Sequence, residues 1–127
     1  MRGNRTCLAR NSYVKYTDTM SVEFTVYKDR YVWNNRKNEL NMKKHGIGFE
    51  EATGVFDDPF SIEVYDEENS LDEDRFRVTG TITGTIHGRF VTVSVTYRDE
   101  LIRIFSARDA DMNEVEEYYN GVRSIIG

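Results

Sequence analysis

Residues 33–59 read WNNRKNELNMKKHGIGFEEATGVFDDP and contain two short helical patterns, each followed by a residue that stops a helix. One of the two asparagines that open the stretch can accept hydrogen bonds from the free amides of a first helix, which we expect to run to about His45. Gly46 fits the left-handed conformation that ends many helices. From Gly48 onward, apolar residues recur three and four positions apart as far as the aspartates before Pro59. The stretch therefore predicts two short N-terminal helices joined by a sharp turn.

Basic residues gather at the end of the first predicted helix, where Lys43, Lys44 and His45 follow one another. Cations stabilise the negative end of a helix dipole, but the same residues could bind an anionic ligand, and both interpretations stay open. Helical spacing puts Leu40 and Lys44 on the side of Trp33, facing the protein. Three basic residues are left for solvent or for a ligand: Arg36, Lys37 and Lys43.

The rest of the chain alternates between apolar and polar residues and predicts a mainly antiparallel, twisted sheet. An opening strand or hairpin is expected within residues 21–33. Residues 90–98 alternate almost perfectly, with three valines on one face and Thr92, Ser94 and Thr96 on the other. Short turns are expected at residues 84–88 and 98–100, and the last strand at residues 101–107.

A closing helix is predicted from about Asp111, because Asp111 and Glu114 have the spacing of a capping box and an apolar stripe follows them. Two acidic segments are predicted to be solvated. One holds six acids within residues 66–74, and the other is Asp57-Asp58. A paired-carboxylate site at Asp57 and Asp58 is the alternative, which the divergence of adjacent side chains disfavours.

Composition restricts the class of protein. A chain of 127 residues can bury one hydrophobic core, so we expect a single α+β domain at residues 20–127 after a weakly ordered extension, or a partner-docking arm, at residues 1–19. The single cysteine, Cys7, has no internal disulfide partner, and no Cys/His cluster has metal-ligand spacing. No apolar run is long enough to span a membrane. From these features we expect a cytoplasmic protein. The net charge of −5 argues against unselective nucleic-acid binding, so any anion site must be a local concentration of cations.

Four arginines within and just after the predicted strands are candidates for such a site. Arg75 and Arg77 share a face of one strand, Arg103 lies within the last strand, and Arg108 lies just past its end. Guanidinium groups stay charged and bind phosphate oxygens through a two-pronged fork. Several of them on one face would bind a phosphate. For each arginine the alternative is an ion pair with a neighbouring acid, such as Asp109 beside Arg108.

Three blocks of sequence occur in a recognisable order: KKHGIGFEEATGVFDDP at residues 43–59, DRFRVTG at residues 74–80 and IRIFSARDA at residues 102–110. Their order and spacing resemble the BrnT family of bacterial type II toxins over residues 31–118. The resemblance implies a RelE-like α+β fold and metal-independent endoribonuclease activity without a cofactor. It also implies an RNA substrate and a DNA-binding, BrnA-like antitoxin, and it allows a dimer of toxin–antitoxin pairs.

Metal-independent RNA cleavage commonly uses the ribose 2′-hydroxyl as the nucleophile, and it needs proton transfer and cations around the phosphorane. The ordinary pKa of histidine suits proton transfer near neutral pH. The residues predicted to be catalytic are His45, Lys44, Arg75, Arg103 and Arg108. Those predicted to bind substrate are Lys43, Arg77 and Tyr97.

Two other functions stay open beside the enzyme. One is a catalytically weak or inactive toxin-like module that binds an antitoxin, which the acidic residues of the last helix favour. The other is a small α+β domain without a nucleic-acid role. The presence of Lys44, His45, Arg103 and Arg108 favours the enzyme.

Overall fold

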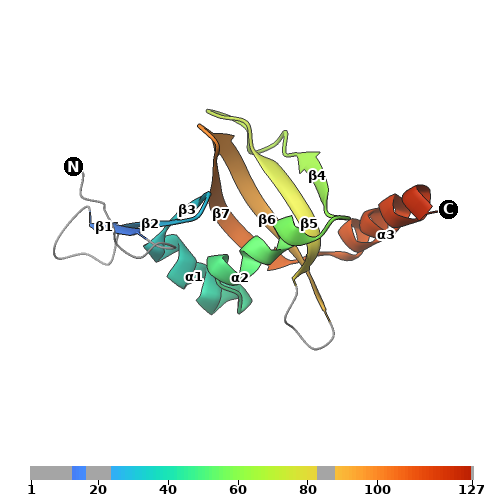
Figure 1. Cartoon of the computed structure of the whole chain (residues 1–127), viewed down its shortest axis with the longest axis horizontal. Coiled ribbons are helices and arrows are strands. Elements are labelled where there is room, and N and C mark those ends of the chain that lie inside the picture. The colour runs from blue at the N-terminus through green and yellow to red at the C-terminus, as the bar shows by residue number, and fades with distance from the viewer. Residues whose placement is uncertain (1–12, 17–23, 83–87, 127) are drawn as a thin grey trace.

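The computed structural model describes residues 13–16, 24–82 and 88–126, which have an α+β architecture (Figure 1). In this part of the chain seven strands form one sheet in the order β1-β2-β3-β7-β6-β5-β4. Neighbouring strands are antiparallel except β3 and β7, which are parallel, so the sheet is mixed and mainly antiparallel. The strands are β1 (Tyr13–Tyr16), β2 (Phe24–Lys28), β3 (Tyr31–Asn34), β4 (Ile62–Tyr65), β5 (Phe76–Ile82), β6 (Arg89–Arg98) and β7 (Leu101–Asp109). Most of the predicted extension at residues 1–19 and of the predicted turn at residues 84–88 lies outside the described residues.

Helix α1 (Asn35–His45) begins and ends where the sequence predicted. Asn34 is the N-cap, and its side-chain oxygen accepts a hydrogen bond of 3.0 Å from the amide of Lys37. Gly46 has a φ of +70° and its amide donates to the carbonyl of Met42 at 2.9 Å. The next helical segment is short: α2 (Phe49–Ala52) is one turn and continues as the 3₁₀ helix η1 (Thr53–Asp57).

The hydrophobic core lies between one face of the sheet and the α2–η1 segment. Val91, Val93 and Val95 of β6 are fully buried, as the alternating pattern predicted. The apolar side of the helical segment meets them with Phe49 and Val55, which are also fully buried. This arrangement fixes the position of α1, because α2 follows it after a turn of only three residues.

The buried side of α1 differs from the prediction. Leu40 is 53% exposed, and the residue that faces the protein is Asn41, which is 7% exposed. Its side-chain amide donates to the carbonyl of Ala107 at 2.7 Å and accepts from the amide of Ala107 at 3.2 Å. β3 pairs with β7 only at Tyr31 and Val32, so the edge of β7 beyond that point needs other partners, which an apolar side chain could not supply.

Asp58 was predicted to be a solvated helix stop, and this prediction is wrong. The residue is 7% exposed and accepts hydrogen bonds from the amide and hydroxyl of Thr81 (both 2.9 Å), from the amide of Phe60 (2.9 Å) and from the hydroxyl of Tyr118 (2.7 Å). Burial alone would raise the pKa of Asp58, but these donors lower it below its ordinary value. One carboxylate therefore links η1, β5 and the last helix.

Asp66, at the start of the acidic loop, is not solvated either. It is 3% exposed, and its carboxylate contacts Arg77 at 3.1 Å and accepts from the side chain of Asn69 at 2.9 Å. The loop therefore turns back on a buried acid before β5 begins.

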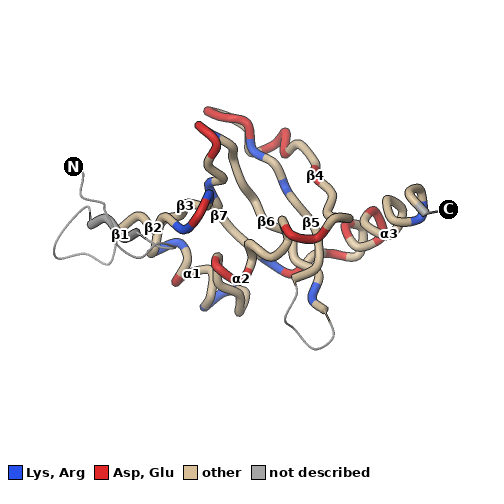
Figure 2. The backbone as a smooth tube through the Cα atoms, viewed as in Figure 1, with Lys and Arg blue, Asp and Glu red and all other residues tan. Residues whose placement is uncertain are grey.

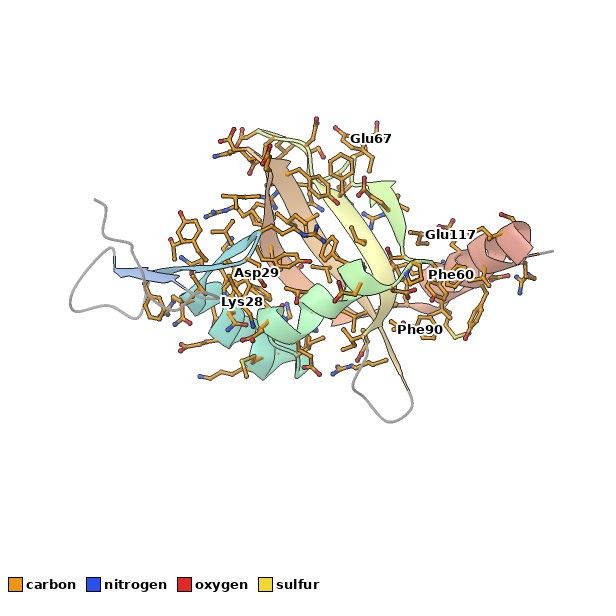
Figure 3. All side chains as sticks on the ribbon, viewed as in Figure 1. Lys28, Asp29, Phe60, Glu67, Phe90 and Glu117 are labelled. Atoms are coloured by element: carbon orange, nitrogen blue, oxygen red, sulfur yellow. The ribbon has the colours of Figure 1, made fainter. Side chains whose placement is uncertain are left out.

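Helix α3 (Met112–Ile126) closes the chain and extends from the end of β7 beside β4 and β5 (Figure 1). The predicted capping box is confirmed, because the amide of Glu114 donates to Asp111 at 2.8 Å and the amide of Asp111 donates to Glu114 at 2.9 Å. Tyr118 and Tyr119 pack on the ring of Phe90, which Figure 3 labels near the start of α3. None of the helices described here is long and apolar enough to cross a membrane.

Candidate nucleic-acid interface

The face of the sheet opposite the core, which we call the outer face, carries most of the predicted arginines. Cross-strand partners in an antiparallel sheet share a face. The register pairs Arg77 with Ser94, Arg108 with Thr92 and Arg103 with Thr96. All of these lie opposite the buried valines of β6. Arg75 precedes the inward-facing Phe76, which pairs with Val95, so strand alternation directs Arg75 to the outer face as well.

Two of the polar side chains of β6 on this face, both threonines, are buried. Thr92 and Thr96 are 1% and 3% exposed. The hydroxyl of Thr92 lies 2.7 Å from that of Thr79, and the hydroxyl of Thr96 donates to the carbonyl of Asp74 at 2.7 Å. The arginines lie beside two threonines whose hydroxyls already have hydrogen-bond partners.

Phe105 lies at an irregularity in β7 and contacts two cations. The ladder pairs Ser94 with Ser106 and Val95 with Ile104, which leaves Phe105 as the extra residue of a β-bulge. The guanidinium carbon of Arg75 lies 3.9 Å from the centre of the Phe105 ring, and the ammonium of Lys37 lies 5.3 Å from it. The Phe105 ring therefore contacts Arg75, just before β5, and Lys37 of α1. Arg103 lies two residues before Phe105 on β7.

Described acids lie near this group without forming ion pairs with its cations, and Asp99 lines the same hollow as Arg103. Figure 2 shows acidic residues at the end of the sheet where the β4–β5 connection and the β6–β7 turn lie. Glu73 contacts Arg98 at 2.7 Å, and Asp74 accepts from the hydroxyl of Tyr65 at 3.0 Å. Within the described ranges, Lys37, Arg75 and Arg103 make no ion pair.

Arg108, in contrast, is bound to an acid. Its two terminal nitrogens each donate to Glu114 at 2.9 Å, and this hydrogen bonding raises the pKa of Arg108. Glu114 also accepts from the hydroxyl of Thr92 at 2.9 Å and lies 3.9 Å from Arg77. Burial alone would raise the pKa of Glu114, but the hydrogen bonds, chiefly those from Arg108, lower it. The carboxylate of Glu114 therefore lies between Arg108, Thr92 and Arg77.

His45 is separate from the arginines at Phe105 and lies near the far end of β7. Its backbone carbonyl accepts from Arg89 at 3.2 Å, and Arg89 also contacts Asp109 at 2.6 Å. The hydrogen bond from Arg89, aided by the nearby charge of His45, lowers the pKa of Asp109. Among residues with described positions, the His45 side chain has no hydrogen bond or ion pair with Arg75, Arg103 or Arg108.

The remaining predicted residues divide between surface positions and the opposite face. Lys43 and Lys44 are exposed on the last turn of α1. Tyr97 pairs with Ile102 on the core side of the sheet, and its hydroxyl donates to Glu63 at 2.5 Å. Burial, followed by this hydrogen bond, raises the pKa of Tyr97. Tyr97 thus lies on the face opposite Arg103.

The structure places all four predicted arginines on the outer face, Arg75 and Arg103 at one end of it and Arg77 and Arg108 farther along it. Sequence reasoning missed Phe105 as the residue that holds Arg75, and it missed Glu114 as the partner of Arg108. It left Lys37 unassigned between solvent and ligand, although one signal was available, because a lysine in the first turn of a helix opposes the dipole. Chemically, this surface offers cations to an anion that has several charges.

Comparison with known proteins gives one result. A family model described as the ribonuclease toxin, BrnT, of type II toxin–antitoxin systems matches residues 33–114, more than half of the chain. No curated protein gives a significant match. The matched segment includes α1, β5, β6 and β7 and therefore every residue of the candidate interface.

Proposed function

Because the chain belongs to the BrnT family of ribonuclease toxins, we propose that it is the toxin of a type II toxin–antitoxin pair and cuts RNA without a metal ion. The observation that carries this proposal is the pair Arg75 and Arg103, two outer-face guanidinium groups that have no acid partner among the described residues of a chain with a net charge of −5. Unneutralised guanidinium groups are suited to phosphate oxygens.

In the proposed reaction the ribose 2′-hydroxyl attacks the adjacent phosphorus, the P–O5′ bond breaks, and a 2′,3′-cyclic phosphate and a 5′-hydroxyl form. Arg75 and Arg103 bind phosphates of the RNA strand at one end of β7 and contribute positive charge to the reaction from there. His45 takes the proton from the 2′-hydroxyl or gives one to the leaving oxygen, and Lys44 beside it supplies further positive charge. Lys43, Arg77 and Tyr97 have secondary roles in substrate binding, of which Tyr97 is the least supported because it lies on the opposite face.

The course of β7 supports a path for the RNA. The strand carries Arg103 near one end and Arg108 near the other, both on the outer face. Arg89 joins the carbonyl of His45 to Asp109, the residue after Arg108, which pairs with Val91 and so points to the core face. An RNA strand that followed the outer face of β7 would pass from the unneutralised cations to Arg108, at the end of β7 where His45 lies. Arg108 joins the site only when Glu114 releases it.

A type II family implies a cognate antitoxin, and we propose a DNA-binding, BrnA-like protein for that role, with a dimer of toxin–antitoxin pairs as the assembly. We further propose a RelE-like fold for the domain at residues 20–127 and a cytoplasmic location.

A second candidate function is a toxin-like module that binds the antitoxin without cutting RNA. The observation that favours it is the hydrogen-bonded fork between Arg108 and Glu114, which removes one predicted catalytic cation from the surface.

The experiment is digestion of RNA in excess EDTA, followed by analysis of the new ends. The proposal predicts cleavage and 2′,3′-cyclic phosphate ends, and His45→Ala should lower the rate by about 10²–10⁴-fold if His45 is a general acid or base. A change below about threefold would remove His45 from that role. Loss of all cleavage in EDTA, with activity restored by a divalent metal, would contradict the metal-independent mechanism. An inactive protein that still binds its antitoxin would favour the second candidate.

A further inference from the structure

We infer that Lys37, Arg75 and Arg103 together form a binding site for the phosphates of single-stranded RNA, with Phe105 as the positioning residue that holds Lys37 and Arg75 in place. The inference rests on the proposed function and adds a substrate-binding residue, Lys37, and a positioning residue, Phe105.

Positive charge is crowded around Phe105. Because the charges of Arg75 and Lys37 lie 3.9 and 5.3 Å from the centre of one ring, they are at most about 9 Å apart. This separation is within the Debye length of about 10 Å at 0.1 M salt, so the two charges repel each other. Neither Lys37 nor Arg75 forms an ion pair with a described acid. A polyanion would relieve the repulsion.

Lys37 occupies an unfavourable position for a cation in α1. It is the third residue of the helix, and the first turn contains no acid. A cation there opposes the partial positive charge of the free amides, so Lys37 does not stabilise its own helix. Its ammonium is instead directed to Phe105, which lies 68 positions later in the chain.

The β-bulge at Phe105 provides the aromatic ring. If Phe105 were absent, Ile104 and Ser106 would alternate regularly across the sheet, and β7 would carry no ring between them. The bulge places a ring between α1 and β5, where it can contact cations from both. A ring whose faces attract cations fixes their position without neutralising them, which an acid in the same place would do. Phe105 therefore leaves both charges available to a ligand.

The test is the salt dependence of binding to a short single-stranded RNA with 2′-O-methyl sugars, which the proposed 2′-hydroxyl attack cannot cleave. Fluorescence anisotropy at several salt concentrations gives the slope of log K against log [salt], and each phosphate contact contributes about 0.7 to it for single strands. Lys37→Gln should lower the slope by about 0.7, and Lys37→Arg should keep it. Arg36→Gln, which removes the same charge one residue earlier on the exposed side of α1, is the matched control and should leave the slope unchanged.

Phe105→Leu tests the positioning role, because it removes no charge. It should lower both the affinity and the slope, and Phe105→Tyr, which retains an aromatic ring, should restore them. Circular dichroism of each variant establishes that it is folded.

The inference is overturned if folded Lys37→Gln keeps the wild-type slope, or if Arg36→Gln lowers the slope equally. If that happens while the wild type cuts RNA in EDTA, the proposed function stands without this site. If the wild type neither binds nor cuts RNA, the proposed function fails as well.

Discussion

Replacing Glu114 with glutamine should show whether Arg108 is a substrate ligand or a member of a structural ion pair. Glu114 accepts two hydrogen bonds of 2.9 Å from Arg108, one from Thr92 and one from the amide of Asp111. Glutamine has the same shape and can still serve in a capping box, so Glu114→Gln removes the charge and keeps the start of α3.

The loss of stability can be estimated from the contacts. Hydrogen bonds to charged groups contribute about 1.5–3 kcal/mol each, but the side chain of Arg108 is 36% exposed, so solvent screening reduces that contribution. We expect a decrease of about 1–2 kcal/mol in the free energy of unfolding, which corresponds to a decrease of roughly 4–8 °C in Tm.

The effect should depend on pH in a defined direction. The pKa of Glu114 in the folded protein is below its ordinary value of 4.5, so the ionised carboxylate stabilises the fold above pH 4.5, and this contribution is lost as the pH falls through the folded-state pKa. Urea denaturation of wild type and variant should therefore show the largest difference in free energy at neutral pH and a smaller one in acid. An equal difference at both would refute the ionised pair.

The same variant should alter activity. If Arg108 contacts phosphate, removal of the competing carboxylate should raise the rate of RNA cleavage in EDTA although the protein is less stable. If cleavage falls in parallel with stability, Arg108 is a member of a structural ion pair and not a substrate ligand.

Five further substitutions test the fold that supports the interface. Asn41→Leu should lower the free energy of unfolding in urea by about 2–4 kcal/mol, because it leaves the buried amide and carbonyl of Ala107 without partners, whereas Leu40→Ala on the exposed side should change it by less than about 0.5 kcal/mol. Asp58→Asn should lower Tm through the loss of about 1–3 kcal/mol, because the amide cannot accept all the hydrogen bonds that the buried carboxylate accepts; an unchanged Tm would contradict its linking role. Gly80→Ala should destabilise the fold by about 1–3 kcal/mol, because the new Cβ would lie 3.1–3.3 Å from Ser61, Val55 and Asp58. Gly121→Ala in α3 should stabilise the fold by up to about 1 kcal/mol, because its Cβ would meet only Ile62 at 3.6 Å. Equal effects of the two substitutions in calorimetry would contradict this difference in packing.

The features that local sequence could predict are those whose partners lie within a few residues. The cap at Asn34, the left-handed Gly46 and the box formed by Asp111 and Glu114 each depend on hydrogen bonds that span three or four positions. The alternation of β6 likewise follows from its own residues, and its valines face the core as predicted.

The features that could not be predicted depend on distant partners. Asn41 is buried because of Ala107, 66 positions later, and Asp58 is buried because of Thr81 and Tyr118. The spacing on α1 favoured Leu40 for the buried position, because buried helix positions are usually apolar. Here the buried position faces the edge of β7, whose backbone needs hydrogen bonds, and Asn41 supplies them.

The candidate site shows the same limit. Arg75, Arg77, Arg103 and Arg108 could be chosen from their residue type and strand positions, but their partners could not. Nothing in the spacing distinguished Arg103, which has no ion pair among the described residues, from Arg108, which Glu114 binds through two nitrogens. The ring that holds Arg75 required a bulge, which the alternation of β7 did not reveal.

Whether RNA binds the outer face of the sheet is tested by the rates of RNA cleavage in EDTA by the variants Arg103→Gln and Arg123→Gln. Both variants remove one exposed or half-buried arginine, but Arg103 is on the outer face and Arg123 is on the last turns of α3, where it donates to Asn120. The account predicts a loss of at least about tenfold, or 1.4 kcal/mol, for Arg103→Gln and a rate within about twofold of wild type for Arg123→Gln. Equal rates for wild type and folded Arg103→Gln would contradict it.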